Sequence, residues 1–491
     1  MANGPKLHWM AGTLSILIFA VLLTLRLGIL EKGEIALSGG SFFKVQTKTD
    51  RETWMNISQQ GKKIGYAHRE FNKTAEGYKV VESVFMQINV MGMVQNVGFK
   101  TEGYLHPDLT LSSFDFDLQS GVFRFKAKGI LKEKTLVLYT GEGGSLRKFE
   151  MPFEELPSLS MTLLQGLSHE DLKPGESKTF PIFDPATMSH RSMKILVLDE
   201  EMIQIMGRPE KARKLSIEFM GIPQFAWIGQ DGTVLREDGS LGISLEQVTR
   251  EEALSRVAPS SSADVTQLAS IPVNQSIWDA NELRELRIKI DGVKGEDAFL
   301  NGDRQSLQED ILTIRKEWTS YLPQSTVGEM SPADRKTYLE SSPMIQSDAP
   351  EIQALVKEIV STNDPARVKA RKLVAWVHEK IQKRPVLSVP NALETLQNRM
   401  GDCNEHAVLL AALGRASGIP TQVESGLVYQ SGRFYYHAWN VFYLGGWITA
   451  DSSRGQFPAD VTHIRFVRGT EKQIDLVRFV GRVSLEILSH K

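Results

Sequence analysis

The sequence predicts an α+β protein in three parts: an N-terminal transmembrane helix over residues 9–30, an antiparallel β sandwich or half-barrel domain over residues 40–257, and a C-terminal domain of helices followed by strands over residues 351–491. Three observations lead to this prediction. An apolar run stands near the N-terminus, apolar and polar residues alternate between residues 50 and 250, and helical spacing of apolar residues begins near residue 352. The chain of 491 residues also exceeds the size of one ordinary core.

Composition narrows the class of protein. Hydrophobic residues make up 41% of the chain and charged residues 24%, which is typical of globular domains. The formal net charge of −2 gives no overall basic footprint, so we expect no nucleic-acid partner. Cys403 is the single cysteine, so the chain can form no internal disulfide.

The N-terminal segment has the length needed to cross a bilayer. Residues 9–25 are apolar apart from threonine and serine, Arg26 interrupts the run, and residues 27–30 resume it, against a requirement of about 20 residues. No small-x-small cleavage site follows, which favours an uncleaved anchor over a cleaved signal peptide. Residues 1–8 would be a short tail. The flanking charges do not decide the orientation. Because an N-terminal anchor usually holds its domain outside the cytoplasm, we expect a single-pass protein of the inner (cell) membrane with the bulk of the chain on the periplasmic side.

Residues 50–250 have the pattern of β structure. In residues 121–128, Phe123, Phe125 and Ala127 alternate with basic residues. Gly-Gln-Asp-Gly at residues 229–232 is flanked by short apolar runs and predicts a hairpin. Many short strands with regular turns predict the sandwich or half-barrel. The histidines in this region are scattered and predict no site.

A Pro/Ser-rich break at residues 258–264 marks a domain boundary. We assign residues 258–280 to a linker and residues 281–350 to a connecting region, with one strand over residues 283–290. Apolar residues with helical spacing follow over residues 352–360 and 370–381. Asp364 and Pro365 supply an N-cap and a first-turn proline for the second of these helices.

The residues that carry chemistry begin with Gly-Asp-Cys-Asn-Glu-His-Ala at residues 401–407. Asp402 and Glu405 form a capping-box pattern, and Gly418 and Pro420 end the helix that follows. Cys403 is therefore expected in the first helical turn, where the helix dipole should lower its pKa below the usual value of about 8.5. The free amides of that turn can also donate to an oxyanion.

A cysteine nucleophile needs a base and a group that orients the base. Residues 421–429, 434–443 and 447–451 have the pattern of three antiparallel strands, with His437 on the second and Asp451 at the end of the third. Paired neighbours on adjacent strands lie about 4.5–5.5 Å apart, so Asp451 can hold one tautomer of His437. Each residue alone also fits a structural role, as a buried small side chain, a strand histidine or a turn residue.

From residue 391 to about residue 469 the chain resembles the core of the transglutaminase-like superfamily in its bacterial, membrane-associated form. Three motifs carry the resemblance, in the family's order: residues 401–407, Tyr-His-Ala-Trp at 436–439, and Trp-Ile-Thr-Ala-Asp at 447–451. The resemblance implies a papain-like α+β core and a catalytic triad of Cys403, His437 and Asp451. The family usually has Asp-Pro-Thr at the third motif, whereas this chain has Asp-Ser-Ser at 451–453.

Neighbouring polar residues have simpler explanations. Asp402 and Glu405 suit a helix cap better than acid–base chemistry. His406 and Asp402 are four residues apart and could bind a metal, but no third ligand is evident. Further residues that could line or wall the cleft, or serve only the structure, are Asp460, His463 and Trp439.

These motifs predict an enzyme that acts on amide bonds of protein or peptide substrates through a thioester at Cys403. Water as the second acceptor would make it a peptidase or amidase, and a lysine-type amine would make it a cross-linking transglutaminase. Bacterial relatives favour hydrolysis slightly. The chemistry needs no metal or organic cofactor. The alternative is a non-catalytic envelope binding or scaffolding protein. The expected partners are the substrate, the membrane through the N-terminal helix, and an envelope protein docked on the β domain.

Overall fold

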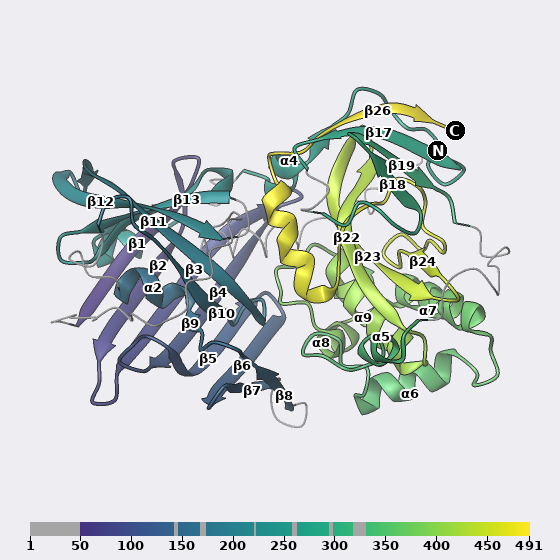
Figure 1. Cartoon of the computed structure of the whole chain (residues 1–491), viewed down its shortest axis with the longest axis horizontal. Coiled ribbons are helices and arrows are strands. Elements are labelled where there is room, and N and C mark those ends of the chain that lie inside the picture. Colours follow the sequence, from purple (N-terminus) through teal and green to yellow (C-terminus); the bar gives the residue numbers. More distant parts are fainter. Residues whose placement is uncertain are drawn as a thin grey trace. The chain divides into compact units, whose positions relative to one another are not determined.

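The computed structural model describes residues 50–141, 146–166, 173–219, 222–257, 263–293, 298–317 and 330–491. These residues divide into two compact units, one that ends at Asp264 and one that spans Val265–Lys491. Figure 1 shows the strands of the first unit and the mixed helices and strands of the second.

A single fifteen-stranded sheet dominates the first unit. Strand β1 (Arg51–Gln59) lies at its middle, and β15 (Ile243–Val248) pairs with it in antiparallel register from Trp54 opposite Val248 to Gln59 opposite Ile243. Strands β2 to β8 extend the sheet on one side and β14 to β9 on the other, in the order of the chain. Their bounds are β2 (Lys62–Lys73), β3 (Tyr78–Val90), β4 (Met93–Leu105), β5 (Leu111–Ser120), β6 (Phe123–Lys132), β7 (Thr135–Thr140), β8 (Arg147–Pro152), β9 (Ser158–Leu159), β10 (Ser177–Asp184), β11 (Ser189–Ile205), β12 (Arg208–Phe219), β13 (Ile222–Gly229) and β14 (Val234–Asp238).

Side chains of this sheet alternate between a buried and a more exposed face, as period-two sequences require. Phe123, Phe125 and Ala127 of β6 are buried, while Arg124 and Lys128 between and beside them are exposed. The hairpin predicted around residues 229–232 joins β13 to β14. The sheet has the half-barrel form, one of the two predicted forms, and not that of a sandwich. Short helices α2 (Ser160–Gly166), η4 (Ser240–Gly242) and α3 (Arg250–Ala253) complete the unit.

The second unit is built around a sheet with the order β16-β23-β22-β25, with β24 also paired to β23. Helix α9 packs against β22 and β23. The side-chain amide of Asn440 on β23 donates to the carbonyl of Ala407 on α9 at 2.9 Å, which ties the helix to the sheet. The bounds are α4 (Val265–Ala269), β16 (Ile271–Pro272), α5 (Pro332–Thr337), α6 (Pro350–Ile359), α7 (Ala366–Lys380), β20 (Gln382–Lys383), α8 (Ala392–Asn398), β21 (Met400–Gly401), α9 (Cys403–Ala416), β22 (Thr421–Gln430), β23 (Arg433–Tyr443), β24 (Trp447–Ala450), β25 (Ile464–Arg468) and η5 (Thr470–Phe479).

A second, four-stranded sheet in this unit has the order β18-β19-β17-β26. It joins β17 (Glu285–Asp291), β18 (Gln305–Gln308) and β19 (Ile311–Arg315) to β26 (Ser484–His490), so two segments far apart in the sequence pair directly (Figure 1). Leu286, Ile288 and Ile290 of β17 are buried and alternate with more exposed residues. The strand predicted over residues 283–290 is therefore present with a small shift in its bounds.

The α+β class predicted for the whole chain is wrong, because the chain is mostly β. Strands hold 49% of the residues and helices 19%. The predicted helical stripes do form α6 and α7. These helices are outweighed because the first unit consists almost entirely of strands, and because the second unit contains three sheets, of five, four and two strands.

The predicted transmembrane helix and the single-pass inner-membrane localisation are also corrected. No helix in the described part of the chain is both long and apolar enough to span a membrane. The longest of these helices, α7, has 15 residues and carries several charges, whereas a span needs about 20 apolar residues. Residues 9–30, on which the prediction rested, lie outside the described residues.

Candidate active site

The first turn of α9 presents Cys403, as the sequence predicts. Asp402 is the N-cap, and its side-chain Oδ1 accepts from the backbone N–H of Asn404 at 3.0 Å. Glu405 completes the capping box by accepting from the backbone N–H of Asp402 at 2.9 Å. A second hydrogen bond holds Glu405, because the Ser388 hydroxyl donates to it at 2.6 Å. The cap therefore fixes the position of the residue that follows it, Cys403.

The electrostatics of the thiol differ from the prediction. Burial raises the pKa of the Cys403 thiol, and the adjacent carboxyl of Asp402 raises it further, although a hydrogen bond from the backbone N–H of Ala438 acts in the opposite direction. Burial also raises the pKa of Asp402, and so does its close contact with Glu405. The expected thiolate at the helix N-terminus is therefore not the resting state, because loss of solvation outweighs the helix dipole.

His437 on β23 and Asp451 after β24 meet as the strand order predicts. The imidazole Nε2 of His437 lies 2.7 Å from Oδ2 of Asp451. Burial would raise the pKa of Asp451, but His437 and His463 hold it well below the ordinary value, so the carboxylate is ionised and accepts this proton. Burial lowers the pKa of His437 despite Asp451, so its imidazole rests neutral at neutral pH.

The Cys403 thiol lies beside this pair. It accepts the backbone N–H of Ala438, the residue after His437 on β23. Since Nε2 of His437 faces Asp451, Nδ1 is the ring nitrogen that does not face this carboxylate. A nucleophile candidate, a neutral base and an ionised carboxylate therefore come from one helix end and two adjacent strands.

Residues 353–452 match the transglutaminase-like superfamily. The matched segment includes Cys403, His437 and Asp451, so the resemblance carried by the three motifs is confirmed. No curated protein is significantly similar to the chain.

Two solved structures are similar to parts of the chain. One is a β-barrel-like protein of a domain of unknown function from Brucella abortus. The alignment covers 40% of this chain and 95% of that protein, with 10% sequence identity and a TM-score of 0.32. The other is a candidate cysteine protease from Cytophaga hutchinsonii. The alignment covers 43% of this chain and 87% of that protein, with 16% sequence identity and a TM-score of 0.26.

The matched segment departs from the usual pattern of the superfamily at residues 452–453, and hydrogen bonds hold the turn there. The Ser453 hydroxyl donates to Oδ1 of Asp451 at 2.7 Å, and the backbone N–H of Arg454 donates to the same oxygen at 3.1 Å. The carbonyl of Ser452 lies 2.9 Å from Nδ1 of His378 on α7. The two serines therefore support the carboxylate of Asp451 in the conformation that meets His437.

His463 is the residue whose importance the sequence understated. It precedes β25 and is fully buried, with Nε2 at 3.0 Å from Oδ2 of Asp451 and Nδ1 at 3.2 Å from Oδ1 of Asp460. The sequence offered both residues only as candidates for lining the cleft. No motif marks them, because the contact depends on how residues 452–463 turn back to Asp451.

Trp439 closes one side of the histidine pair. Its ring centroid lies 6.1 Å from that of His437 and 5.1 Å from that of His463. Its indole N–H donates to Glu424 on β22 at 2.9 Å. Burial opposes ionisation of Glu424, but Arg468 and Arg465 dominate and lower its pKa to about 2. A buried ionic network therefore fixes the tryptophan beside the site.

Access to the site is limited. The exposed fractions of Cys403, His437 and Asp451 are 0%, 2% and 1%. A peptide therefore reaches the thiol only if part of the surrounding chain moves. The same burial strengthens every charge interaction within the site, since water is excluded.

His437, Asp451 and His463 are a group that could hold a cation by residue type, with donor atoms within 4.8 Å of one another. Zinc ligands lie about 2.0–2.2 Å from the metal, which separates them by about 3.3 Å in a tetrahedral site. The separations of 2.7 and 3.0 Å found here fit direct hydrogen bonds better. His406 does not form the metal pair considered from the sequence, because its Nδ1 lies 2.6 Å from the backbone carbonyl of Asp402 and not at the carboxylate.

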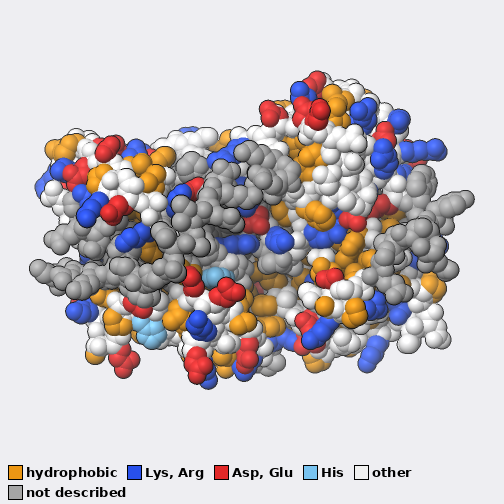
Figure 2. Space-filling view, viewed as in Figure 1, with side chains coloured by type: hydrophobic (Ala, Val, Ile, Leu, Met, Phe, Trp, Pro, Cys, Tyr) orange, Lys and Arg blue, Asp and Glu red, His pale blue; other side chains and the backbone are white. Residues whose placement is uncertain are grey.

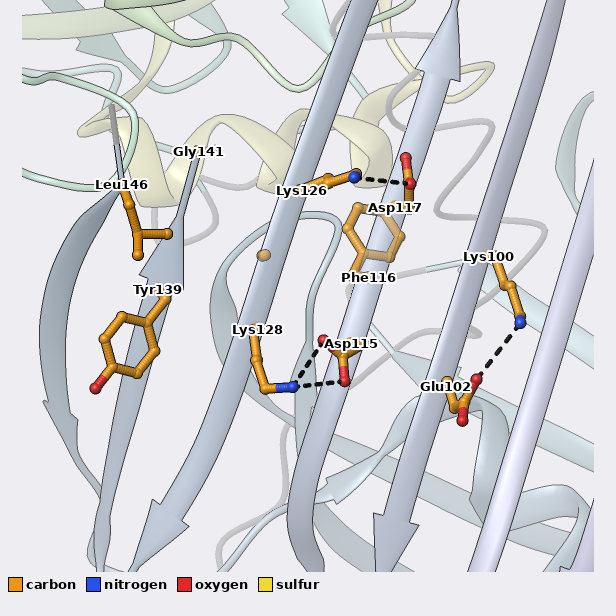
Figure 3. Close-up of a pocket in the computed structure, with 11 residues that line it drawn as sticks. Lys100, Glu102, Asp115, Phe116, Asp117, Lys126, Lys128, Tyr139, Gly141 and Leu146 are labelled. Atoms are coloured by element: carbon orange, nitrogen blue, oxygen red, sulfur yellow. Dashed lines mark hydrogen bonds and ion pairs between the residues drawn. The ribbon is translucent and has the colours of Figure 1, made fainter. Parts of the chain in front are cut away.

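A groove of about 410 Å³ on the first unit has different chemistry (Figure 3). Its charged side chains neutralise one another, with Lys128 at 3.1 Å from Asp115 and Lys100 at 3.4 Å from Glu102. Figure 2 likewise shows charges of both signs interspersed on the visible surface. The groove contains no nucleophile and base pair comparable to that of the transglutaminase-like core.

Proposed function

We propose that this protein is a cysteine enzyme that cleaves amide bonds of protein or peptide substrates through a thioester on Cys403. The observation that carries the proposal is the 2.7 Å contact between His437 Nε2 and Asp451 Oδ2 beside a thiol held at a helix N-terminus. The superfamily match supports a cysteine enzyme in general terms. The choice of substrate and of second acceptor belongs to the proposal.

In the first half-reaction, Nδ1 of His437 accepts the proton of the Cys403 thiol as sulfur attacks the amide carbonyl carbon. The carbonyl π electrons move onto oxygen, and the backbone N–H of Cys403 in the first turn of α9 donates to that oxyanion. Collapse of the tetrahedral intermediate breaks the C–N bond, and His437 protonates the leaving amine. Asp451 holds the ring and stabilises its positive charge while it carries the extra proton.

In the second half-reaction, His437 removes a proton from water, and the water oxygen attacks the thioester carbon. The C–S bond breaks, and the Cys403 sulfur recovers its proton from His437. We favour water over a protein amine because the thiol is completely buried, and the smallest acceptor enters such a site most easily. An amine acceptor would follow the same steps and would yield a cross-link.

Cys403 is the single cysteine, so a thioester can form at one position only. We expect p-nitrophenyl acetate to release one equivalent of p-nitrophenolate rapidly and to add one acetyl group to the chain, as intact-mass spectrometry detects. The variants Cys403→Ala and His437→Ala should lose the rapid phase. His106→Gln, which alters an exposed histidine of the first unit, is the matched control and should keep it.

A wild-type protein that forms no acyl adduct at any pH, while folded, would overturn the proposal and favour the scaffolding alternative. Once the adduct is established, a casein substrate supplied with a fluorescent amine separates the two acceptors. New peptide termini without amine incorporation support hydrolysis. Amine incorporation without cleavage contradicts the preference for water and assigns transamidation.

A further inference from the structure

A buried chain of side chains continues beyond the three residues used above. Asp451 Oδ2 contacts both His437 and His463, at 2.7 and 3.0 Å. His463 in turn contacts Asp460 Oδ1 at 3.2 Å. Each of these residues is nearly or fully buried. The arrangement runs without interruption from His437 through Asp451 and His463 to Asp460.

We propose that His463, held by Asp460, is a positioning residue for acyl transfer, which fixes the carboxylate of Asp451 and sets how strongly that carboxylate holds a proton on His437. The inference rests on the proposed function, since it assigns His463 a part in the same reaction. His463 itself does not contact the substrate. It acts through Asp451.

Hydrogen bonds hold the carboxylate of Asp451 on both of its oxygens. Oδ1 of Asp451 is occupied by the Ser453 hydroxyl and the Arg454 N–H, and Oδ2 by His437 and His463. Both oxygens therefore have fixed donors, and the carboxylate cannot rotate without losing hydrogen bonds. Because His463 shares Oδ2 with His437, it directly affects the oxygen that orients the base.

The partners of His463 determine how many protons its imidazole carries. Both nitrogens of His463 face carboxylate oxygens, which accept but do not donate when ionised. An imidazole in that setting carries protons on both nitrogens and a positive charge. Burial works against this charge, but Asp460 and Asp451 outweigh it, and the pKa of His463 is raised. The same contacts hold the pKa of Asp460 below its ordinary range.

The charge of His463 also affects the pKa of His437. The positive charge of His463 lies close to His437, with ring centroids 5.8 Å apart, and it lowers the pKa of His437. It thus offsets part of the attraction that Asp451 exerts on a His437 proton and keeps the base neutral at rest. Two further cations lie near His463. The guanidinium of Arg454 is 3.7 Å from Asp460, and Arg304 donates to the carbonyl of His463 at 3.1 Å. The titratable and charged groups that surround His463 are therefore Asp451, Asp460, His437, Arg454 and Arg304.

Asp460 stays in place without His463, which makes the idea testable. Its Oδ1 also accepts the backbone N–H of Thr462 at 2.8 Å and the Thr462 hydroxyl at 2.6 Å. Its Oδ2 accepts the Gln456 amide at 2.8 Å. A substitution at His463 therefore removes one partner of a turn that keeps its other hydrogen bonds.

The test is the pH dependence of Cys403 acylation by p-nitrophenyl acetate in wild type, His463→Gln and Asp460→Asn, with His106→Gln as the control. Glutamine can still donate to Asp451 but carries no charge, and Asp460→Asn removes the partner that keeps His463 charged. In both variants we expect the acid limb to move to higher pH. Coulomb's law across 5.8 Å with an effective dielectric constant of about 20 gives a shift of about one to two pH units. A lower plateau with an unmoved acid limb would assign His463 a purely structural role and overturn the proposal.

A second measurement, of the protonation state of His463, does not require any site variant to be active. Histidine ring signals of ¹³C-labelled wild-type protein can be followed by NMR against pH, with His463→Gln and His437→Gln used only for assignment. We expect one buried histidine, His463, to remain an imidazolium well above pH 6.5, the ordinary histidine value, while His437 is neutral there. A neutral His463 at pH 6 refutes the proposal even if neither variant can be acylated. A charged His463 in a protein that never acylates would instead refute the proposed function alone.

Discussion

Gly426 offers a direct test of how the sheet positions His463. It lies on β22 where the pairing with β25 shifts register, and a Cβ added there would stand 1.9 Å from the carbonyl oxygen of Ile464 and 2.9 Å from the backbone nitrogen of Phe466. Carbon and carbonyl oxygen ordinarily approach to about 3.3 Å, so Gly426→Ala must separate the strands by about 1.4 Å. That displacement acts on the residue next to His463, whose contact with Asp451 is only 3.0 Å long.

We expect Gly426→Ala to lower the free energy of unfolding of the second unit by about 1–3 kcal/mol, as overpacking of a tight core does. It should also slow acylation of Cys403, because the contacts around Asp451 loosen. The assay is the urea dependence of Cys403 alkylation, which reports opening of this unit alone because the chain has one cysteine. Gly98→Ala is the matched control, since its added Cβ would come no closer than 3.8 Å to another atom. If Gly426→Ala matches the wild type in both midpoint and acylation rate, the packing argument is refuted.

Three further outcomes follow from the site. Iodoacetamide should modify Cys403 at a rate that rises through an apparent pKa above the free-thiol value of about 8.5, because burial and Asp402 raise the pKa of the thiol. Asp451→Asn should keep the fold but slow acylation by about 10²–10⁴-fold, because His437 loses the acceptor that fixes its tautomer. The wild type should lose about 3 kcal/mol of unfolding free energy through Glu424 as the pH falls from about 4.5 to 2 in urea titrations. The sign follows from a folded-state pKa below the unfolded one, so the contribution is complete above the ordinary value and disappears in acid.

Controls separate these outcomes from general damage. Full alkylation of folded protein below pH 7 would contradict a neutral resting thiol. Asp310→Asn changes a surface carboxylate and should leave acylation unchanged. Glu424→Gln should remove the acid-dependent loss of stability, whereas Glu150→Gln, on the exposed face of β8, should not. An identical acid profile in Glu424→Gln would show that other carboxylates cause the loss.

Local signals in the sequence predicted the elements of the site well. The capping residues Asp402 and Glu405 give the start of α9, and the turn at residues 431–432 separates β22 from β23. The antiparallel pairing of β23 with β24 brings His437 within reach of Asp451, which follows β24. These features depend on residues close in the chain or on adjacent strands, for which propensity and pattern carry most of the information.

Local sequence patterns do not predict burial that depends on residues far apart in the chain. The position of Cys403 in a helix first turn predicted a thiolate, but the sign of its pKa shift depends on exclusion of water, which no local pattern records. The role of His463 depends on a turn that returns the chain to Asp451. The balance of strand and helix was misjudged because the first unit forms one wide sheet, and the number of strands in a sheet is set by pairing and not by any one strand.

The capping box of α9 also makes the helix end that holds Cys403 sensitive to high pH. Burial and the neighbouring carboxyl of Glu405 raise the pKa of Asp402, so Asp402 keeps its proton at a pH where an ordinary aspartate has lost it. Once strong alkali removes that proton, two negative charges face each other at the end of the helix that holds the nucleophile. The helix end that holds Cys403 would then loosen. Replacement of Asp402 by asparagine, which caps without charge, is therefore the natural first step toward a variant that works in alkaline solution.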